Sequence, residues 1–230
     1  MNVIKAVILA AGEGKRMRPL TLVKPKPLLE VRGRTILEHI FEALPEEVHE
    51  VYIVVKYLRE QIENFLKGKF PHKKIMFVEG SSLGNAYSFL AAKPYIGANE
   101  RFLVIHGDDL PSRNEMRECL KHERSVLVCE SAEPENCGVI ALNQDGTIQQ
   151  ILEKPPHPQS NRVAGGVMVF SGDIFGYEPK ASPGGEYFLT SLVSEYCKNF
   201  PVHPVYTGPC RQFSSPADLK TIEQVLDKRL

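Results

Sequence analysis

The sequence predicts an α/β protein with a doubly wound, mainly parallel but mixed sheet, and three observations support this fold class. Short apolar runs alternate with longer segments of helical spacing through the first half of the chain. Such alternation implies right-handed crossovers between parallel strands. After about residue 125 strand-like runs predominate, which predicts a strand-rich second portion of the same sheet.

Four apolar runs in the first half are predicted strands because they are short, rich in Val, Ile and Phe, and bounded by polar residues or glycine. They are Val3–Leu9, Glu50–Val55, Lys74–Val78 and Arg101–Ile105. Helices are predicted over residues 35–44, 57–66 and 83–92. Thr35-Ile-Leu-Glu38 and Ser112-Arg-Asn-Glu115 are typical capping boxes at helix starts. Helices on both faces of the sheet make the expected architecture Rossmann-like.

The second half predicts four more strands and one tight turn. The strands are Val126–Glu130, Gly138–Leu142, Thr147–Leu152 and Val163–Phe170. Asn143-Gln-Asp-Gly146 is expected to turn the chain between the second and third of them. A helix over 187–198, a short strand over 202–206 and a final helix after Ser215-Pro-Ala-Asp218 complete the expected order.

Composition and charge exclude several classes of protein. The 230 residues include 28 basic and 28 acidic side chains, so the chain lacks the overall positive field of a general nucleic-acid binder. Its apolar runs fall short of the roughly 20 residues that span a bilayer. The first run leads into Gly-Glu-Gly-Lys-Arg instead of a small-residue cleavage site, so we expect a strand there and not a signal peptide. Neither nucleic acid nor a membrane is an expected partner.

The five cysteines are widely spaced and form no C-x-x-C pair. Their odd number fits neither a disulfide framework nor a zinc site. We therefore expect small apolar core residues with free thiols in a reducing, cytoplasmic setting. They are Cys119, Cys129, Cys137, Cys197 and Cys210.

The loop after the first strand has the composition of an anion-binding loop. Gly12 and Gly14 allow a bound group to approach the backbone closely, and five basic residues without an acid lie between Lys15 and Lys26. The loop is neither a Walker motif nor a Rossmann G-x-G-x-x-G, because Met17 stands where the third glycine would be. The alternative interpretation is a solvated basic surface loop.

This loop resembles the signature of the sugar-1-phosphate nucleotidylyltransferases, which make nucleoside-diphosphate sugars. The pattern is Gly12-x-Gly14-x-Arg16-Met17-x-Pro19-x-Thr21, followed by Lys24-Pro-Lys-Pro-Leu28. The resemblance continues in order through Leu83-Gly84, His106-Gly-Asp-Asp109, Cys137-Gly-Val139, Glu153-Lys-Pro155 and Glu186-Tyr-Phe-Leu-Thr190. It covers nearly the whole chain and implies an enzyme of the EC 2.7.7 class. It further implies one domain over 1–230, with a nucleotide-binding half over about 1–125 and a sugar-binding half over about 126–230.

The resemblance also implies a reaction and its residues. A sugar-1-phosphate oxygen attacks the α-phosphorus of a nucleoside triphosphate in line, and pyrophosphate leaves. The implied catalytic residues are Arg16, Lys26 and Asp108, with Asp108 as a ligand of Mg²⁺. The implied nucleotide-binding residues are Leu9, Ala10, Ala11, Gly12, Gly14, Lys15, Glu79 and Gly84. The implied sugar-phosphate-binding residues are Gly138, Glu153, Lys154 and Gly166.

Structural alternatives stay open for several of these residues. Asp108 has the position of a helix cap, and Asp109 is expected to support it from behind. His106 is expected to be an ordinary strand-end residue because the reaction needs no protein base of its kind. Glu153 and Lys154 have the composition of solvated surface, and Gly138 that of a β-bulge.

The sequence departs from the family pattern in ways that bear on metal and substrate. Gln212 stands where the family has an aspartate as second metal ligand; it is either a neutral Mg²⁺ ligand or a surface residue. A carboxylate at Glu79 only accepts hydrogen bonds, which favours UTP, dTTP or GTP over CTP. Asn85 replaces a frequent Thr, and Ala164-Gly-Gly166 replaces Asn-Ala-Gly.

Two alternative functions remain at this point. One is a cytidylyl-type transferase acting on phosphocholine or another small phosphorylated metabolite, against which Glu153-Lys154 favours a sugar phosphate. The other is a catalytically weak nucleotide-sugar-binding regulatory protein, for which Gln212 is the supporting feature. The chain ends at Leu230 without hexapeptide repeats, so no β-helix domain with acetyltransferase activity is expected. A homo-oligomer is compatible with the sequence but not required by it.

Overall fold

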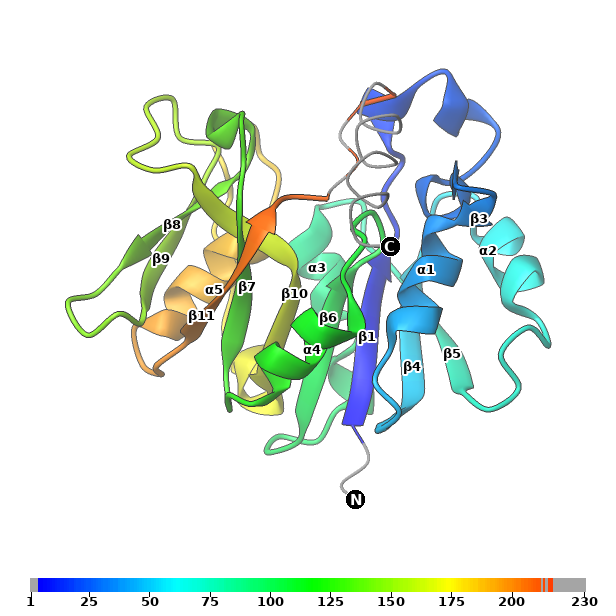
Figure 1. Cartoon of the computed structure of the whole chain (residues 1–230), viewed down its shortest axis with the longest axis horizontal. Helices are drawn as coiled ribbons and strands as arrows, with labels where there is room; N and C mark the ends of the chain where they lie inside the picture. The colour runs from blue at the N-terminus through cyan, green and yellow to red at the C-terminus, as the bar shows by residue number, and fades with distance from the viewer. Residues whose placement is uncertain (1–3, 212, 214, 217–230) are drawn as a thin grey trace.

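The computed structural model describes residues 4–211, 213, 215 and 216 (Figure 1). Within this part of the chain, nine strands form one sheet: β1 Ile4–Ala10, β4 Val48–Val55, β5 Lys74–Glu79, β6 Arg101–His106, β7 Ser125–Glu130, β8 Gly138–Leu142, β9 Ile148–Glu153, β10 Arg162–Ser171 and β11 His203–Pro209. The strand order is β11-β7-β10-β6-β1-β4-β5, and β8 pairs with both β10 and β9. Two short strands, β2 Glu30–Val31 and β3 Arg34–Thr35, form a separate hairpin.

The sheet is mixed, as the sequence predicts. Strands β1, β4, β5 and β6 are parallel to one another, whereas β10 runs antiparallel between β6 and β7. The predicted doubly wound, mainly parallel arrangement is therefore confirmed. Leu9 pairs in register with His106, and Val55 pairs with Glu79. The carboxyl ends of the four parallel strands consequently meet at one edge of the sheet, where ligands of such folds bind.

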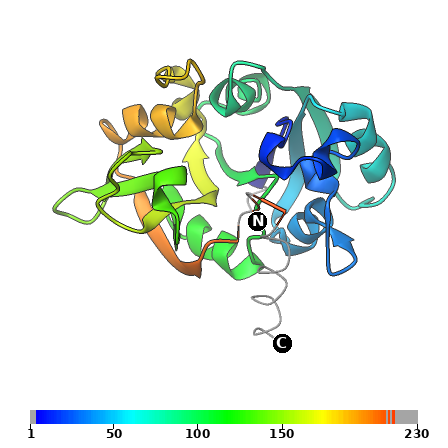
Figure 2. The same cartoon turned by 90° about the horizontal axis from the view of Figure 1, so that it is seen from above.

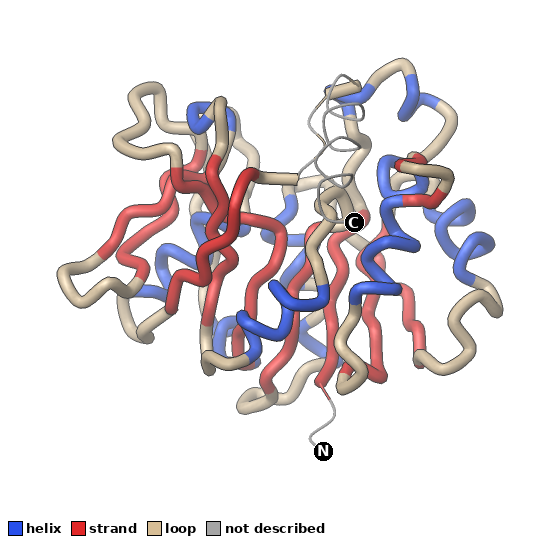
Figure 3. Tube along the Cα trace, in the orientation of Figure 1, coloured by secondary structure: helices blue, strands red, loops and turns tan. Residues whose placement is uncertain are grey.

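Five α-helices of the described residues cover both faces of the sheet (Figure 3). They are α1 Ile36–Ala43, α2 Arg59–Leu66, α3 Asn85–Leu90, α4 Arg113–Leu120 and α5 Leu189–Cys197. Helices α1, α2 and α4 share one buried core with Ile8 of β1, and α3 and α5 share the other with Val7. The two cores lie on opposite faces because successive side chains of a strand point in opposite directions. None of the described helices is long and apolar enough to cross a bilayer.

Both predicted capping boxes are present. The Thr35 hydroxyl accepts from the Glu38 amide and the Glu38 carboxylate accepts from the Thr35 amide, and Ser112 and Glu115 do the same at α4. Helices α2, α3 and α5 begin two residues later than the sequence predicts. Helix α2 begins at Arg59 because Leu58 has a left-handed backbone, with φ of 49°. Helix α3 begins only after Gly84, whose φ of 136° interrupts the helical geometry.

The second half contains the predicted strands and turn. Gly146 donates its amide to the carbonyl of Asn143 and closes the turn between antiparallel β8 and β9. Helix α5 and strand β11 occupy the expected places, although β11 extends to Pro209. The predicted helix after Asp218 lies outside the described residues.

The expectation that all five cysteines are free thiols is wrong. Cys129 and Cys210 form a disulfide, with their Cα atoms 5.1 Å apart, while Cys119, Cys137 and Cys197 are free. The reason is long-range pairing: β11 runs parallel to β7, and Pro209 pairs with Glu130 at the end of the register. This pairing places Cys210 beside Cys129 across 81 residues of sequence, a relationship that cysteine spacing alone does not reveal.

Candidate active site

The first loop and the loop after β6 meet at the carboxyl edge of the sheet. The Gly107 amide donates to the Leu9 carbonyl at 2.9 Å, so the two loops leave the sheet side by side. Lys26 then reaches across, and its Nζ lies 2.6 Å from Oδ2 of Asp108. Lys26 is 8% exposed, and the Asp108 side chain is 29% exposed. Two residues that the resemblance assigned to catalysis thus form a largely buried ion pair with one accessible side.

The first loop has a fixed conformation. Three 3₁₀ turns follow one another, at Lys15–Met17, Leu20–Leu22 and Lys26–Leu28. Met17 is fully buried and anchors the loop in the core beneath it, which explains an apolar residue at the place of a third glycine. The Thr21 hydroxyl donates to the Gly14 carbonyl at 2.8 Å, and the Tyr57 hydroxyl donates to the Thr21 carbonyl at 2.8 Å.

The same loop leaves open space and positive charge at the surface. A side chain placed at Gly12 would meet no atom within 4 Å. Lys15 and Arg16 are exposed, next to this space in the sequence. An open glycine beside exposed cations is the arrangement that lets a polyanion approach the backbone.

Asp109 supports the loop from below. Its carboxylate is buried and accepts hydrogen bonds from the Gly166 amide at 2.7 Å and the Leu110 amide at 2.8 Å. Burial raises the pKa of Asp109, and the Gly166 amide opposes that rise. A Cβ atom on Gly166 would lie 2.4 Å from Oδ2 of Asp109. Gly166 is therefore buried against Asp109. This packing alone explains why the position requires glycine, whether or not a ligand binds there.

The sugar-side residues named by the resemblance gather at the end of β9. The Thr190 hydroxyl donates to Glu153 Oε2 at 2.8 Å, and the Lys154 Nζ lies 3.7 Å from Glu153 Oε1 and 4.4 Å from the centroid of the Phe188 ring. Gly138 is buried, and a Cβ atom there would lie 2.9 Å from a methyl group of Thr190. Glu153, Lys154 and Gly138 thus form one cluster with the start of α5.

Backbone hydrogen bonds join the start of α3 to the segment that precedes α5. The Tyr187 amide donates to the Leu83 carbonyl at 3.0 Å, and the Ala86 amide donates to the Tyr187 carbonyl at 3.1 Å. Gly84 is required here, because a Cβ atom on it would lie 2.3 Å from the Tyr187 carbonyl oxygen. The Asn85 side chain accepts from the Leu189 amide at 2.7 Å and so caps the first turn of α5.

The charge of Arg16 in the first loop influences Cys137 in the second half of the chain. Burial raises the pKa of the Cys137 thiol, and the positive charge of Arg16 is close enough to oppose that rise. Seen from above in Figure 2, the dark-blue first loop lies near the middle of the molecule and the yellow-green segment of β8 and β9 lies at its left side.

Glu79 lies at the end of β5 and already has a partner. Its Oε2 accepts from Arg59 at 2.6 Å, and Arg59 also donates to Glu63 at 2.5 Å. The Glu79 side chain is 59% exposed, so it remains accessible beside its cation. The following residue, Gly80, packs so tightly that a Cβ atom would lie 2.6 Å from Cβ of Ala11. The end of β5 is thus in contact with the first loop.

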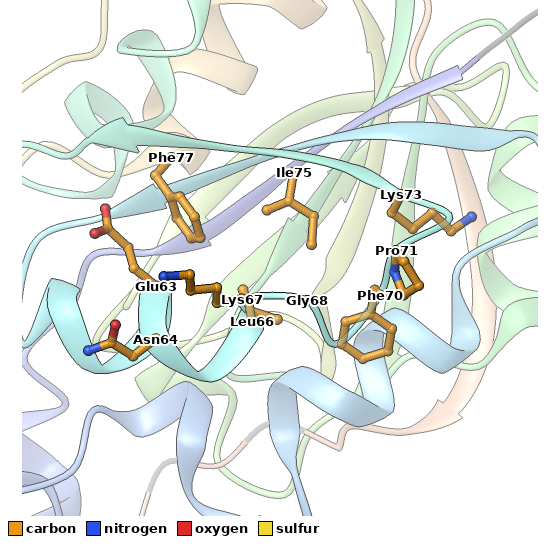
Figure 4. Close-up of a pocket in the computed structure, with 10 residues that line it drawn as sticks. All are labelled: Glu63, Asn64, Leu66, Lys67, Gly68, Phe70, Pro71, Lys73, Ile75 and Phe77. Atoms are coloured by element: carbon orange, nitrogen blue, oxygen red, sulfur yellow. The ribbon is translucent and has the colours of Figure 1, made fainter.

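One pocket of the described residues lies elsewhere. It has a volume of about 450 Å³ and is lined by α2, the turn after it and β5, including Glu63, Lys67 and Phe77 (Figure 4). No residue named by the resemblance lines it. The candidate site is therefore the open surface formed by the loops at the carboxyl edge, and not this pocket.

Most of the expected residues come together, and some of their partners were missed. The loops carrying Lys26, Asp108 and Arg16 meet, and Glu153 and Lys154 lie together. Gln212 lies outside the described residues. The sequence did not reveal that Thr190 and Asn85 hold the sugar-side residues and α5. The motif Glu186-Tyr-Phe-Leu-Thr190 was the one signal for the former.

The fold and this loop geometry define a protein of the nucleotidyltransferase class. The model of the nucleotidyl transferase family matches residues 5–206. The chain therefore belongs to this family, which confirms the resemblance to the sugar-1-phosphate nucleotidylyltransferases.

Sequence similarity to individual proteins supports this family assignment. The chain is 36% identical over 228 residues to the bifunctional protein GlmU of Methanocaldococcus jannaschii, covering 97% of this chain and 54% of that protein. It is 34% identical over 183 residues to the mannose-1-phosphate guanylyltransferase catalytic subunit beta of Drosophila pseudoobscura pseudoobscura, covering 75% of this chain and 49% of the relative. The chain thus spans about half the length of these curated relatives.

A solved structure shares the fold. The inositol-1-phosphate CTP transferase from T. maritima superposes with a TM-score of 0.82 at 22% identity, over 99% of this chain and 96% of that one. At this level of identity the likeness establishes the fold alone.

Proposed function

We propose that the protein transfers the nucleotidyl group of a nucleoside triphosphate to a sugar-1-phosphate, forming a nucleoside-diphosphate sugar and releasing pyrophosphate. The observation that carries the proposal is the 2.6 Å ion pair between Lys26 and Asp108 at the carboxyl edge of the sheet. It joins a phosphate-binding cation and a metal-binding carboxylate at one point, and a chain that only stored or transported a sugar would need neither.

The proposed reaction needs positioning and charge neutralisation rather than covalent catalysis. An oxygen of the sugar-1-phosphate attacks the α-phosphorus, the bond to the bridging oxygen breaks, and pyrophosphate leaves with the electron pair. The backbone at Gly12 and Gly14 takes the triphosphate, while Arg16 and Lys26 balance its charge. Lys26 is suited to an α-phosphate oxygen because an ammonium group is a compact point charge.

The second substrate is assigned to the cluster at the end of β9. Glu153 is held by Thr190 and accepts from sugar hydroxyls, and Lys154 binds the sugar phosphate. The pairing of Tyr187 with Leu83 supports this assignment, since it fixes the sugar-side segment against the nucleotide-side segment. We accordingly divide the chain into a nucleotide-binding half over about 1–125 and a sugar-binding half over about 126–230.

The residues present fit Mg²⁺ as the metal. Among the described residues, no group of three or more His, Cys, Asp or Glu side chains is placed to hold a metal ion by itself. Mg²⁺ suits such a site, since it is commonly bound through one or two carboxylates together with substrate phosphates and water. Asp108 would hold it from the protein side. When bound, the metal would neutralise charge on the phosphates.

The base preference is assigned from Glu79 and Arg59. A carboxylate accepts from the N3–H of uracil or thymine, or from the N1–H and amino group of guanine, and it repels the bare N3 acceptor of cytosine. Arg59 holds this carboxylate in place through the 2.6 Å contact. UTP, dTTP and GTP are therefore the proposed substrates ahead of CTP.

The proposed location is the cytoplasm, where nucleoside triphosphates are available. The Cys129–Cys210 disulfide is uncommon in the reducing cytosol of mesophiles, although disulfides do persist in intracellular proteins of hyperthermophiles. Trapping of thiols with an alkylating agent at the moment of cell lysis measures whether the pair is oxidised there.

A substrate matrix tests the proposed function. Pyrophosphate release is measured with Mg²⁺ for UTP, dTTP, GTP, CTP and ATP, each with phosphocholine and with the 1-phosphates of glucose, N-acetylglucosamine, mannose, galactose and N-acetylmuramate. Asp108→Asn removes the charge at unchanged size, and Asp145→Asn in the β8–β9 turn is the matched control. We expect one productive pair that is lost in the first variant and kept in the second. Activity with phosphocholine alone, or nucleotide-sugar binding without turnover, would replace the proposal.

A further inference from the structure

The end of β11 is fastened to the Asp108 loop by contacts that the proposed reaction does not use. Arg211 follows the disulfide residue Cys210, is 5% exposed, and forms an ion pair with Glu115, which is 7% exposed. Two residues further along, the Phe213 amide donates to the carbonyl of Asp108 at 3.1 Å. The Phe213 side chain is fully buried in the core shared with α1, α2 and α4.

Glu115 is the point where three segments meet. Its carboxylate accepts from the amide and hydroxyl of Ser112 in the capping box, from the hydroxyl of Thr207 in β11, and from Arg211. Helix α4 begins at Arg113, a few residues after Asp108. One carboxylate therefore ties the start of this helix, the last strand and the segment that contacts Asp108.

Two interactions hold residues 210–211, and they connect this segment to different parts of the fold. The disulfide joins Cys210 to β7, and the Cys210 amide donates to the Glu130 carbonyl at 3.0 Å. Arg211, which pairs with Glu115 of α4, lies between that anchor and Phe213 in the sequence. A buried charge pair is costly to break, so it holds its two segments in one arrangement.

We propose that Arg211 is a positioning residue: through its buried ion pair with Glu115 it holds Phe213 on the Asp108 carbonyl, and so fixes the turn from which the Asp108 carboxylate faces Lys26. The inference rests on the proposed function for its catalytic consequence. Arg211 itself touches no substrate. It acts through the backbone of the Asp108 turn, where a small displacement misplaces a group that must meet a phosphate.

The chain offers variants that separate charge from capping. Glu115→Gln removes the charge but keeps an acceptor for the capping box, because glutamine serves at that position. Ser112→Ala removes part of the cap and leaves the ion pair. Arg211→Met removes the cation at similar length, and Arg211→Lys keeps the charge and serves if the methionine variant does not fold. Arg124→Met breaks another largely buried pair, with Asp173, at the opposite end of β7.

The first readout is hydrogen exchange of the Phe213 amide in the free protein, and the second is kcat and KM with the productive substrate pair. We expect Arg211→Met and Glu115→Gln to speed Phe213 exchange about tenfold or more. We expect kcat to fall about tenfold with KM little changed, since the backbone at Gly12 and Gly14 that takes the triphosphate stays in place. Arg211→Lys should restore part of the Phe213 protection and part of kcat. Ser112→Ala and Arg124→Met should lower the melting temperature but should change neither Phe213 exchange nor kcat.

Two results would overturn the inference. One is unchanged Phe213 exchange in Arg211→Met and Glu115→Gln. The other is an equal fall of kcat in Arg124→Met, which would mean that general destabilisation explains the effect. A failure of the proposed function looks different, because the wild-type protein would then form no product, while Phe213 exchange would still report on the contact.

Discussion

Lys26 Nζ lies 2.6 Å from Asp108 Oδ2, although 82 residues separate the two in the sequence. Strands β1 and β6 are neighbours in the sheet, and the loops that follow them place a cation and a carboxylate at one point of its carboxyl edge. Lys26 is nearly buried while Asp108 keeps an exposed side, so a ligand would reach the pair from one direction.

Loss of Lys26 should have a larger effect on the rate of nucleotidyl transfer than on the stability of the fold. Lys26→Met is expected to lower kcat by about 10²-fold, because one preorganised charge at the α-phosphate is removed. Lys24→Met is the matched control, since Lys24 lies in the same loop but pairs at the surface with Glu30 at 2.8 Å. Steady-state rates measure the effect, and melting temperatures separate it from unfolding. Equal rates for the two variants would remove Lys26 from the site.

Alanine substitutions at Gly84 and Gly12 should affect different properties, the first the stability of the fold and the second the binding of substrate. Gly84→Ala meets the Tyr187 carbonyl at 2.3 Å and requires a φ of 136°, so we expect a lower melting temperature. Gly12→Ala meets no atom within 4 Å, so we expect normal stability and a raised KM for the nucleoside triphosphate. Thermal unfolding and saturation kinetics of both proteins check this contrast. A stable Gly84→Ala protein would contradict the close packing of residues 83–86 on Tyr187.

Acid stability should depend on Glu38. Burial alone would raise the pKa of Glu38, but hydrogen bonds from Lys69 and Thr35 outweigh it and lower the pKa from 4.5 to about 2. A carboxyl with a lowered pKa stabilises the fold above its unfolded value, and this contribution is lost as the pH falls from about 4.5 toward 2. Glu38→Gln keeps the cap and should lose less stability over that range than the wild type. Urea unfolding at several pH values measures it, with Glu60→Gln as an exposed control; equal slopes would argue against the prediction.

Reduction should destabilise the protein through one pair of cysteines. A cross-link over 81 residues contributes about 4 kcal/mol in the chain-entropy model. We expect a reductant to lower the melting temperature of the wild type and of Cys197→Ser alike. The double variant Cys129→Ser/Cys210→Ser should melt at a lower temperature that does not respond to the reductant. A response in the double variant would show that another thiol chemistry is involved.

Local features of the sequence predicted the fold well because they act over few residues. The apolar runs of β1, β4, β5 and β6 and the capping boxes at Thr35 and Ser112 are complete within short segments. The pairing of β11 with β7 is not local, and so the disulfide between Cys129 and Cys210 was missed.

The candidate site divides in the same way. Lys26 and Asp108 were named from motifs, because each motif lies in one loop. The partners that hold the loops were not, since they come from distant segments. Glu115 was identified as a capping residue, but its ion-pair partner, Arg211, lies 96 residues away. Gly166 was expected at the sugar site, and the structure adds that it packs against Asp109, where a Cβ atom would lie 2.4 Å from Oδ2.

The most direct test of nucleotidyl transfer follows the phosphorus atoms. The productive nucleoside triphosphate is supplied with its label at the α-phosphate in one reaction and at the γ-phosphate in another, together with the sugar-1-phosphate and Mg²⁺. We predict that the α-label appears in the nucleoside-diphosphate sugar and the γ-label in pyrophosphate, and that Asp108→Asn abolishes both. A γ-label found on the sugar product, or an α-label found only in free nucleoside monophosphate, would contradict the proposed reaction.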